Sequence, residues 1–98
     1  MSTLTDAIQR LRDKEASTSC EQMVELLCKL GFEVQRRKSG NHHVMDHDGI
    51  PGFTGANFDG GHDKHMKAVY VRQLRKLLEK YSAEISAALS ERNDEQSR

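Results

Sequence analysis

The spacing of apolar residues predicts two helices in the first third of the chain. Near the start, apolar side chains recur every three or four positions, at Leu4, Ala7, Ile8 and Leu11, and this pattern predicts a short amphipathic helix over 5–15. Ser19 and Gln22 have the spacing of a capping box, so a second helix should begin near Cys20. Gly31 follows an apolar face of leucines and methionine and should end that helix in the left-handed conformation.

The periodicity then changes from that of a helix to that of a strand. Phe32 and Val34 alternate with polar residues, so a strand should begin there. A second strand is expected over 41–46 and a weaker third strand, which contains Gly55, over 53–58. The dipeptides Ser39-Gly40 and Asp48-Gly49 are typical of the turns between these strands.

A long amphipathic helix is predicted to close the chain. Apolar residues recur every three or four positions across 68–90, at Val71, Leu74, Leu78, Tyr81, Ile85 and Leu89. Residues 91–98 are polar and are expected to form a disordered tail. The whole pattern indicates one α+β domain over 1–98, with residues 1–17 as an added N-terminal helix and the core over 19–90.

The composition shows where basic residues are concentrated and indicates a reducing cellular compartment. Basic and acidic residues balance at 15 each, yet residues 36–38 and 64–80 together carry nine basic side chains and one acidic one. Cys20 and Cys28 should lie about 12 Å apart on one helix, too far to form a disulfide with each other. No apolar run approaches membrane-spanning length, so a reduced, cytoplasmic protein without membrane contact is expected.

Histidine is the residue type that points to chemistry. All five histidines lie between positions 42 and 65, and His42 and His43 follow the basic run Arg36-Arg37-Lys38 at the expected hairpin. An imidazole titrates near pH 6.5, so a histidine beside phosphate-binding cations is suited to moving protons on an RNA backbone. His42 is therefore a candidate general base.

These motifs resemble those of the HicA-like (YcfA-like) mRNA interferase toxins over residues 23–79. The matching segments are Leu30-Gly31-Phe32, Gly40-Asn41-His42-His43 and, in the last helix, the leucine-rich 70–78. The family pattern at the hairpin is Gly-Ser-His, so Asn41 stands where the family has serine. The resemblance implies a double-stranded-RNA-binding-like fold, built as a helix, a three-stranded antiparallel sheet and a helix, here with an extra N-terminal helix and an extended last helix.

The resemblance also implies an activity and its residues. His42 would be the catalytic base of a ribosome-independent mRNA endoribonuclease that needs no cofactor and is neutralised by a HicB-like antitoxin. His43 and His62 are accessory candidates, either of which could serve as the general acid. Residues of the hairpin and the last helix are candidates for contacting RNA phosphates. They are Arg36, Lys38, Gly40, Asn41, Arg72, Arg75 and Lys76.

Other functions remain open from the sequence. The same fold could be a non-catalytic RNA-binding or protein-interaction module. A zinc site is a weaker alternative, because His43 and His47 on one strand face would be about 13 Å apart, too far to share one ion, and the pair His62 and His65 matches no recognised zinc motif. The apolar stripe of the terminal helices could also provide a homodimer surface.

Overall fold

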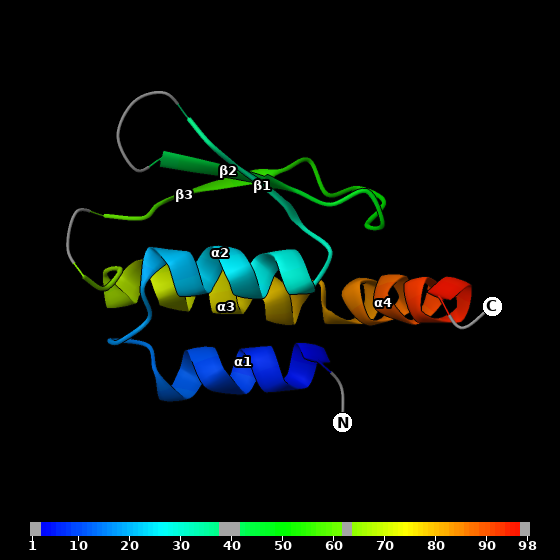
Figure 1. Ribbon diagram of the computed structural model, residues 1–98, viewed down its shortest axis with the longest axis horizontal. Helices are drawn as coiled ribbons and strands as arrows, with labels where there is room; N and C mark the ends of the chain where they lie inside the picture. The colour runs from blue at the N-terminus through cyan, green and yellow to red at the C-terminus, as the bar shows by residue number, and fades with distance from the viewer. Residues whose placement is uncertain (1–2, 38–41, 62–63, 97–98) are drawn as a thin grey trace.

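The chain folds as four helices and a three-stranded antiparallel sheet. The computed structural model describes residues 3–37, 42–61 and 64–96, with residues 91–96 described by their backbone alone. Figure 1 shows the arrangement. The elements are α1 (Thr3–Asp13), α2 (Cys20–Lys29), β1 (Glu33–Arg36), β2 (His42–Asp46), β3 (Ala56–Asp59), α3 (Ala68–Lys80) and α4 (Ser82–Gln96).

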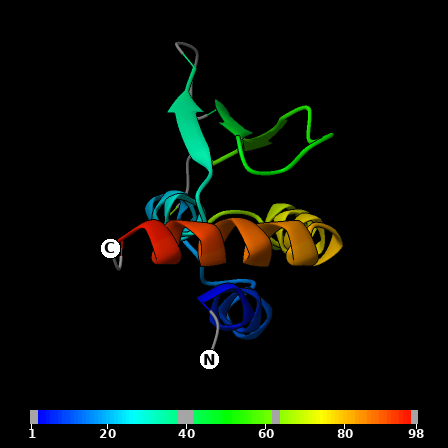
Figure 2. The same cartoon turned by 90° about the vertical axis from the view of Figure 1, so that its right-hand side faces the viewer.

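The helices form two layers on one side of the sheet. α2 and α3 lie side by side beneath the sheet, and α1 lies below them, farther from the strands (Figures 1 and 2). The strands are ordered β1-β2-β3, and both pairs are antiparallel. No helix in the described part of the chain is both long and apolar enough to cross a membrane.

Both ends of α2 have the caps that the sequence predicted. The Ser19 hydroxyl accepts a hydrogen bond from the Gln22 amide at 3.1 Å, and the Gln22 side chain accepts one from the Ser19 amide at 2.9 Å. At the other end Gly31 has a φ of 94°, and the Phe32 amide donates to the Leu27 carbonyl at 3.1 Å. This Schellman arrangement turns the chain sharply from α2 into β1 and needs glycine at position 31.

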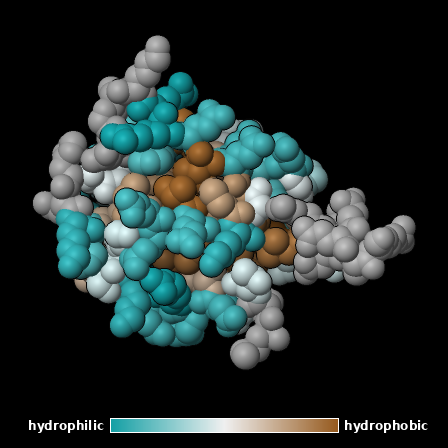
Figure 3. All heavy atoms as spheres, in the orientation of Figure 1, coloured by the Kyte–Doolittle hydropathy of each residue, from teal (hydrophilic) through white to brown (hydrophobic). Residues whose placement is uncertain are grey.

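The core lies between the sheet and the helices and draws on every described element except β1. Its fully buried members include Leu11 from α1, Met23 and Leu27 from α2, Met45 from β2, and Leu78 from α3. In Figure 3, hydrophobic spheres come to the surface between the sheet and α2. The half-buried Val24 and Val34 pack against this core. The single apolar face of α1 is therefore covered by docking, as its sequence pattern predicted.

His47 is a buried histidine that joins α2 to the loop after β2. One ring nitrogen, Nδ1, accepts a hydrogen bond from the Gly49 amide at 3.0 Å, so Nε2 carries the proton and donates to the Leu30 carbonyl at 3.0 Å. The ring also packs edge-on against Phe32, with centroids 4.7 Å apart. A neutral imidazole with both nitrogens bonded is therefore part of the core.

The closing segment is two helices where we predicted one. α3 ends at Lys80, and Tyr81 leaves helical geometry with a φ of −103° and a ψ of 20°. α4 then runs across the ends of the other helices (Figure 2). After the turn, Ile85 of α4 is fully buried in the core. α4 also continues to Gln96, so most of the expected tail is helical, in keeping with its good helix-forming residues.

The strand boundaries also differ from the prediction. β3 begins at Ala56, and residues 53–55, expected within a strand, belong to a loop. Gly52 and Gly55 have φ values of 86° and 95°, which place this segment in a conformation that cannot continue a strand ladder. The connection between β2 and β3 is consequently a longer loop, and Phe53 at its end packs edge-on against Tyr81 at 5.4 Å.

The His47 hydrogen bonds should contribute measurably to stability. We expect His47→Leu to lower the free energy of unfolding by about 2–4 kcal/mol, because the buried Leu30 carbonyl and the Gly49 amide would both lose their partner. Urea denaturation followed by circular dichroism measures the change. The matched control is His42→Leu at an exposed strand position, expected to stay within about 0.5 kcal/mol of the wild type. Equal losses for the two variants would contradict this role for His47.

Candidate functional site

His42 lies at the start of β2 with its side chain exposed on the sheet face that the helices leave open. Its neighbours His43 and Met45 are buried against the helices, so strand alternation directs His42 to the opposite face. Its main-chain carbonyl accepts a hydrogen bond from the Arg37 amide at 2.8 Å, which holds the strand end in place. The position predicted for a general base is thus accessible to a large substrate.

Asp59 stands directly across from His42 on β3. The two residues are paired in the β2–β3 register, so their side chains leave the same face of the sheet. The Asp59 carboxylate also accepts a hydrogen bond from the Gly61 amide at 2.8 Å, which fixes its orientation. The sequence alone does not identify Asp59, because its pairing with His42 depends on the length of the 47–55 loop.

His43 is packed into the protein on the other face of β2. Its ring stacks on Phe58, with an interplanar angle of 6° and centroids 5.1 Å apart. The Cys20 sulfur lies 3.8 Å from Nε2, and the side chain is only 8% exposed. The predicted accessory residue therefore lies beside the core and points away from the face that carries His42.

Cys20 is a neutral thiol in this setting. Burial raises the pKa of the Cys20 thiol, and the nearby positive charge of Arg36 offsets only part of that effect. The thiolate, the nucleophilic form of cysteine, is therefore scarce at neutral pH. The contact between Cys20 and His43 is accordingly a packing contact, and we assign no covalent chemistry to it.

A hollow of about 780 Å³ opens beside His43, between the first turn of α2, the end of β1 and the Gly60-Gly61 loop. Arg36 is paired with His43 in the β1–β2 register, so it enters this hollow from the helix side of the sheet, and Lys64 adds a second positive charge. Glu21 and Glu25 line the same hollow and balance these charges. The structure thus brings the predicted phosphate ligand Arg36 together with His43, whereas His42 faces the other way.

Lys38, Gly40, Asn41 and His62 lie outside the residues that the structure describes. Their predicted roles in phosphate binding and in acid catalysis therefore stay predictions. The described cations nearest to them in sequence are Arg36 and Arg37 before the hairpin and Lys64 after the Gly60-Gly61 loop.

Two of the three predicted phosphate ligands on α3 are engaged in ion pairs within the protein. Arg72 donates two hydrogen bonds to the Glu15 carboxylate, at 2.7 and 3.2 Å. Arg75 donates to Glu79 at 2.6 Å, and Arg12 from α1 reaches the same carboxylate at 3.2 Å. These contacts join α1 to α3, so RNA phosphates would have to compete with carboxylates at Arg72 and Arg75.

The third predicted ligand on α3, Lys76, is exposed and lines a separate groove near the end of that helix. This groove lies between α3 and the loop that precedes β3. The groove lies before the start of β3, and Asp59 at the end of β3 pairs with His42. The groove and His42 therefore lie at opposite ends of the sheet. The structure therefore divides the predicted phosphate ligands between distinct surfaces.

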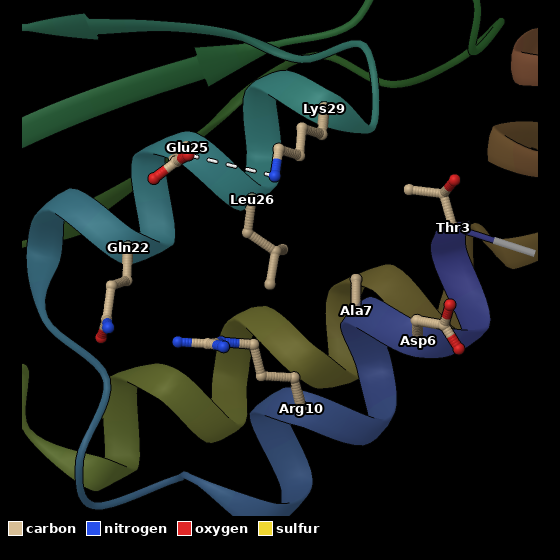
Figure 4. Close-up of a pocket in the computed structure, with 8 residues that line it drawn as sticks. All are labelled: Thr3, Asp6, Ala7, Arg10, Gln22, Glu25, Leu26 and Lys29. Atoms are coloured by element: carbon tan, nitrogen blue, oxygen red, sulfur yellow. Dashed lines mark ion pairs between the residues drawn. The ribbon is translucent and has the colours of Figure 1, made fainter.

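A groove of about 370 Å³ between α1 and α2 is lined by neither histidine nor cysteine among its described residues (Figure 4). Its floor is apolar, with Ala7 and Leu26, and its rim carries charges of both signs. Glu25 and Lys29 pair with each other across one turn of α2 at 3.9 Å. Metal ligands do not gather here or elsewhere among residues 3–37, 42–61 and 64–90, where no three His, Cys, Asp or Glu side chains are placed to hold an ion.

The Arg72–Glu15 pair predicts how stability depends on pH. The hydrogen bond from Arg72 lowers the pKa of Glu15 from its ordinary value of 4.5, so the pair stabilises the fold above that pH. The stabilisation is lost as the pH falls below 4.5 and through the folded-state pKa. Urea midpoints measured from neutral to acid pH should therefore fall less steeply for Glu15→Gln than for the wild type. The control is Glu33→Gln, which makes the same charge change away from the α1–α3 contact. An identical pH profile for both variants would contradict a stabilising role for the Arg72–Glu15 pair.

Comparison of the chain with known protein families, with curated proteins and with solved structures gave no match.

Proposed function

We propose that this protein is a metal-independent endoribonuclease of the HicA-like type, in which His42 takes the proton from a ribose 2′-hydroxyl. The observation that carries the proposal is the exposed His42 on the open sheet face, paired across the strands with Asp59. An exposed imidazole that shares a sheet face with a carboxylate on the neighbouring strand is placed where a general base could act. The Gly-Asn-His-His motif adds the family resemblance to this support.

The order of the elements supports the finer fold assignment within this proposal. The segment from α2 to α3 reads helix, three antiparallel strands, helix, with both helices on one face of the sheet. This is the arrangement that the double-stranded-RNA-binding-like fold implies. α1 and α4 are additions to that core, and the open face of the sheet would be the surface for RNA.

In the proposed reaction, the 2′-oxygen attacks the adjacent phosphorus as His42 accepts its proton. The bond from phosphorus to the 5′-oxygen breaks, and that oxygen gains a proton from an acid or from water. The products are a 2′,3′-cyclic phosphate and a 5′-hydroxyl. Arg37, which follows β1 and donates its amide to the His42 carbonyl, would supply positive charge for the phosphate that passes through a pentavalent state.

The proposal also covers the setting of the enzyme. The substrate would be mRNA in the cytoplasm, and a HicB-like antitoxin would silence the enzyme by covering the open sheet face. Because His42 and Asp59 stand on that face, a partner bound there would exclude RNA from both residues at once.

Replacement of His42 is the direct test of the activity. We expect His42→Ala to reduce cleavage of a structured mRNA about 10²–10⁴-fold, the usual contribution of a general base. The reaction is run with EDTA, and product ends are analysed for 2′,3′-cyclic phosphate. His65→Ala, at a half-buried position away from the strands, is the matched histidine control and should cleave as the wild type does. A wild-type protein that binds RNA without cutting it would instead identify a binding module.

Replacement of Asp59 tests the pairing across the strands. Asp59→Asn removes the charge and keeps an oxygen that can accept the Gly61 hydrogen bond. An exposed charge pair contributes up to about 1 kcal/mol, so cleavage should slow roughly fivefold. Asp46→Asn, on the same face of β2 but beyond this pair, is the control, and an equal effect of the two variants would contradict a specific role for Asp59.

A further inference from the structure

The groove between α3 and the loop before β3 differs from the other hollows in its charge. It has a volume of about 330 Å³, and Lys76 and Lys80 supply its charged groups. None of the described residues that line it is acidic, whereas carboxylates line both the α1–α2 groove and the hollow beside His43. An anion entering this groove would meet two ammonium groups and no opposing carboxylate.

Two aromatic rings form the walls of the groove. Phe53 and Tyr81 meet edge-on, with centroids 5.4 Å apart, and both side chains are half-buried, so part of each ring stays accessible. The Lys80 ammonium lies 5.4 Å from the centre of the Tyr81 ring. Flat rings beside ammonium groups are the combination that single-stranded nucleic-acid sites use for bases and phosphates.

The loop wall is held in shape before any ligand arrives. Phe53 packs against Phe32 with centroids 5.8 Å apart, and its amide donates to the Ile50 carbonyl at 3.1 Å. Gly55 has a φ of 95°, and a side chain there would come within 3.4 Å of the Met45 carbonyl. The loop therefore lies close against β2, and a ligand would lose little binding energy to ordering it.

We propose that this groove binds one nucleotide of single-stranded RNA, with the base against Tyr81 and the phosphate at Lys76 and Lys80. The base takes the place over the ring that the Lys80 ammonium now occupies, and the long lysine side chain moves to the phosphate. The choice of RNA as the strand rests on the proposed function. The carboxylates of an acidic peptide could also pair with the two lysines. They would not stack on the two accessible aromatic rings, as a nucleic-acid base does.

The groove would bind a nucleotide away from the bond that is cut. Asp59 pairs with His42 at one end of β3, and Ala56, next to Gly55, begins the other end. The two ends are about 10 Å apart along the strand, roughly three nucleotides at the 3.4 Å rise of a stacked strand. Because His42 faces the open side of the sheet and the groove lies on the side of α3, an RNA strand that contacts both would have to pass around the β3 edge (Figure 1).

Binding of a fluorescein-labelled oligouridylate to His42→Ala protein, which leaves the RNA intact, tests the groove. We expect Lys76→Gln with Lys80→Gln to weaken binding about tenfold and to lower the slope of log affinity against log salt by about 0.7, the value for the one phosphate that both lysines contact. Lys14→Gln with Lys29→Gln removes the same charge from exposed positions outside the groove and is the control. Equal binding by the two double variants would overturn the proposal.

The base contact has a separate readout because the chain contains two tyrosines. Uridine monophosphate should shift the NMR resonances of the Tyr81 ring and leave those of Tyr70, in the first turn of α3 outside the groove, in place. Tyr81→Leu should weaken oligouridylate binding about fivefold or more, while Tyr81→Phe, which keeps the ring, should bind as the parent does.

The outcomes separate this inference from the proposed activity. Loss of binding in the groove variants supports the groove whether or not the wild type cuts RNA. If the wild type cleaves RNA and its groove variants bind RNA normally, the proposed activity stands and the proposal for the groove is overturned. Polyglutamate that binds as tightly as oligouridylate and shifts the same Tyr81 resonances overturns it as well, because the site would then be for an acidic protein.

Discussion

The turn at the end of α2 is the constraint on which the rest of the structure depends. Gly31 reverses the chain in a left-handed conformation, and the ring of His47 then bonds to the Leu30 carbonyl one residue earlier. That single imidazole joins the end of α2 to the loop that follows β2. Because Phe32 packs against both His47 and Phe53, the same junction sets the position of the loop that faces α3. The angle between the sheet and its helices is therefore fixed by main-chain geometry at one glycine and by two hydrogen bonds of one buried ring.

Local signals in the sequence were enough to predict α2, because its capping residues and its terminal glycine act within one turn of the chain. The break at Tyr81 had no such signal. The apolar stripe continues in register from Val71 to Leu89, whereas α3 ends at Lys80 and the next residue, Tyr81, packs against Phe53 from a distant segment. The start of β3 was misplaced for a related reason, since the positive φ values of Gly52 and Gly55 become evident only in three dimensions.

The candidate site shows the same division between local and distant information. Strand alternation puts His42 and His43 on opposite faces of the sheet, and the burial of His43 agrees with it. Asp59 could not be selected, because its place opposite His42 depends on strand register across a loop. The engagement of Arg72 by Glu15 was also hidden from the sequence, since the two residues belong to distant segments that meet only when α1 docks on α3.

The docking of α1 has an electrostatic consequence. Glu15, which follows α1, neutralises Arg72 of α3. The added helix thus brings an internal counter-ion to α3, and a basic surface that the core sequence alone would present is partly masked from within the same chain. Acquiring or losing such a helix would change the apparent charge of the domain, as seen by a polyanion, without altering any residue of the sheet.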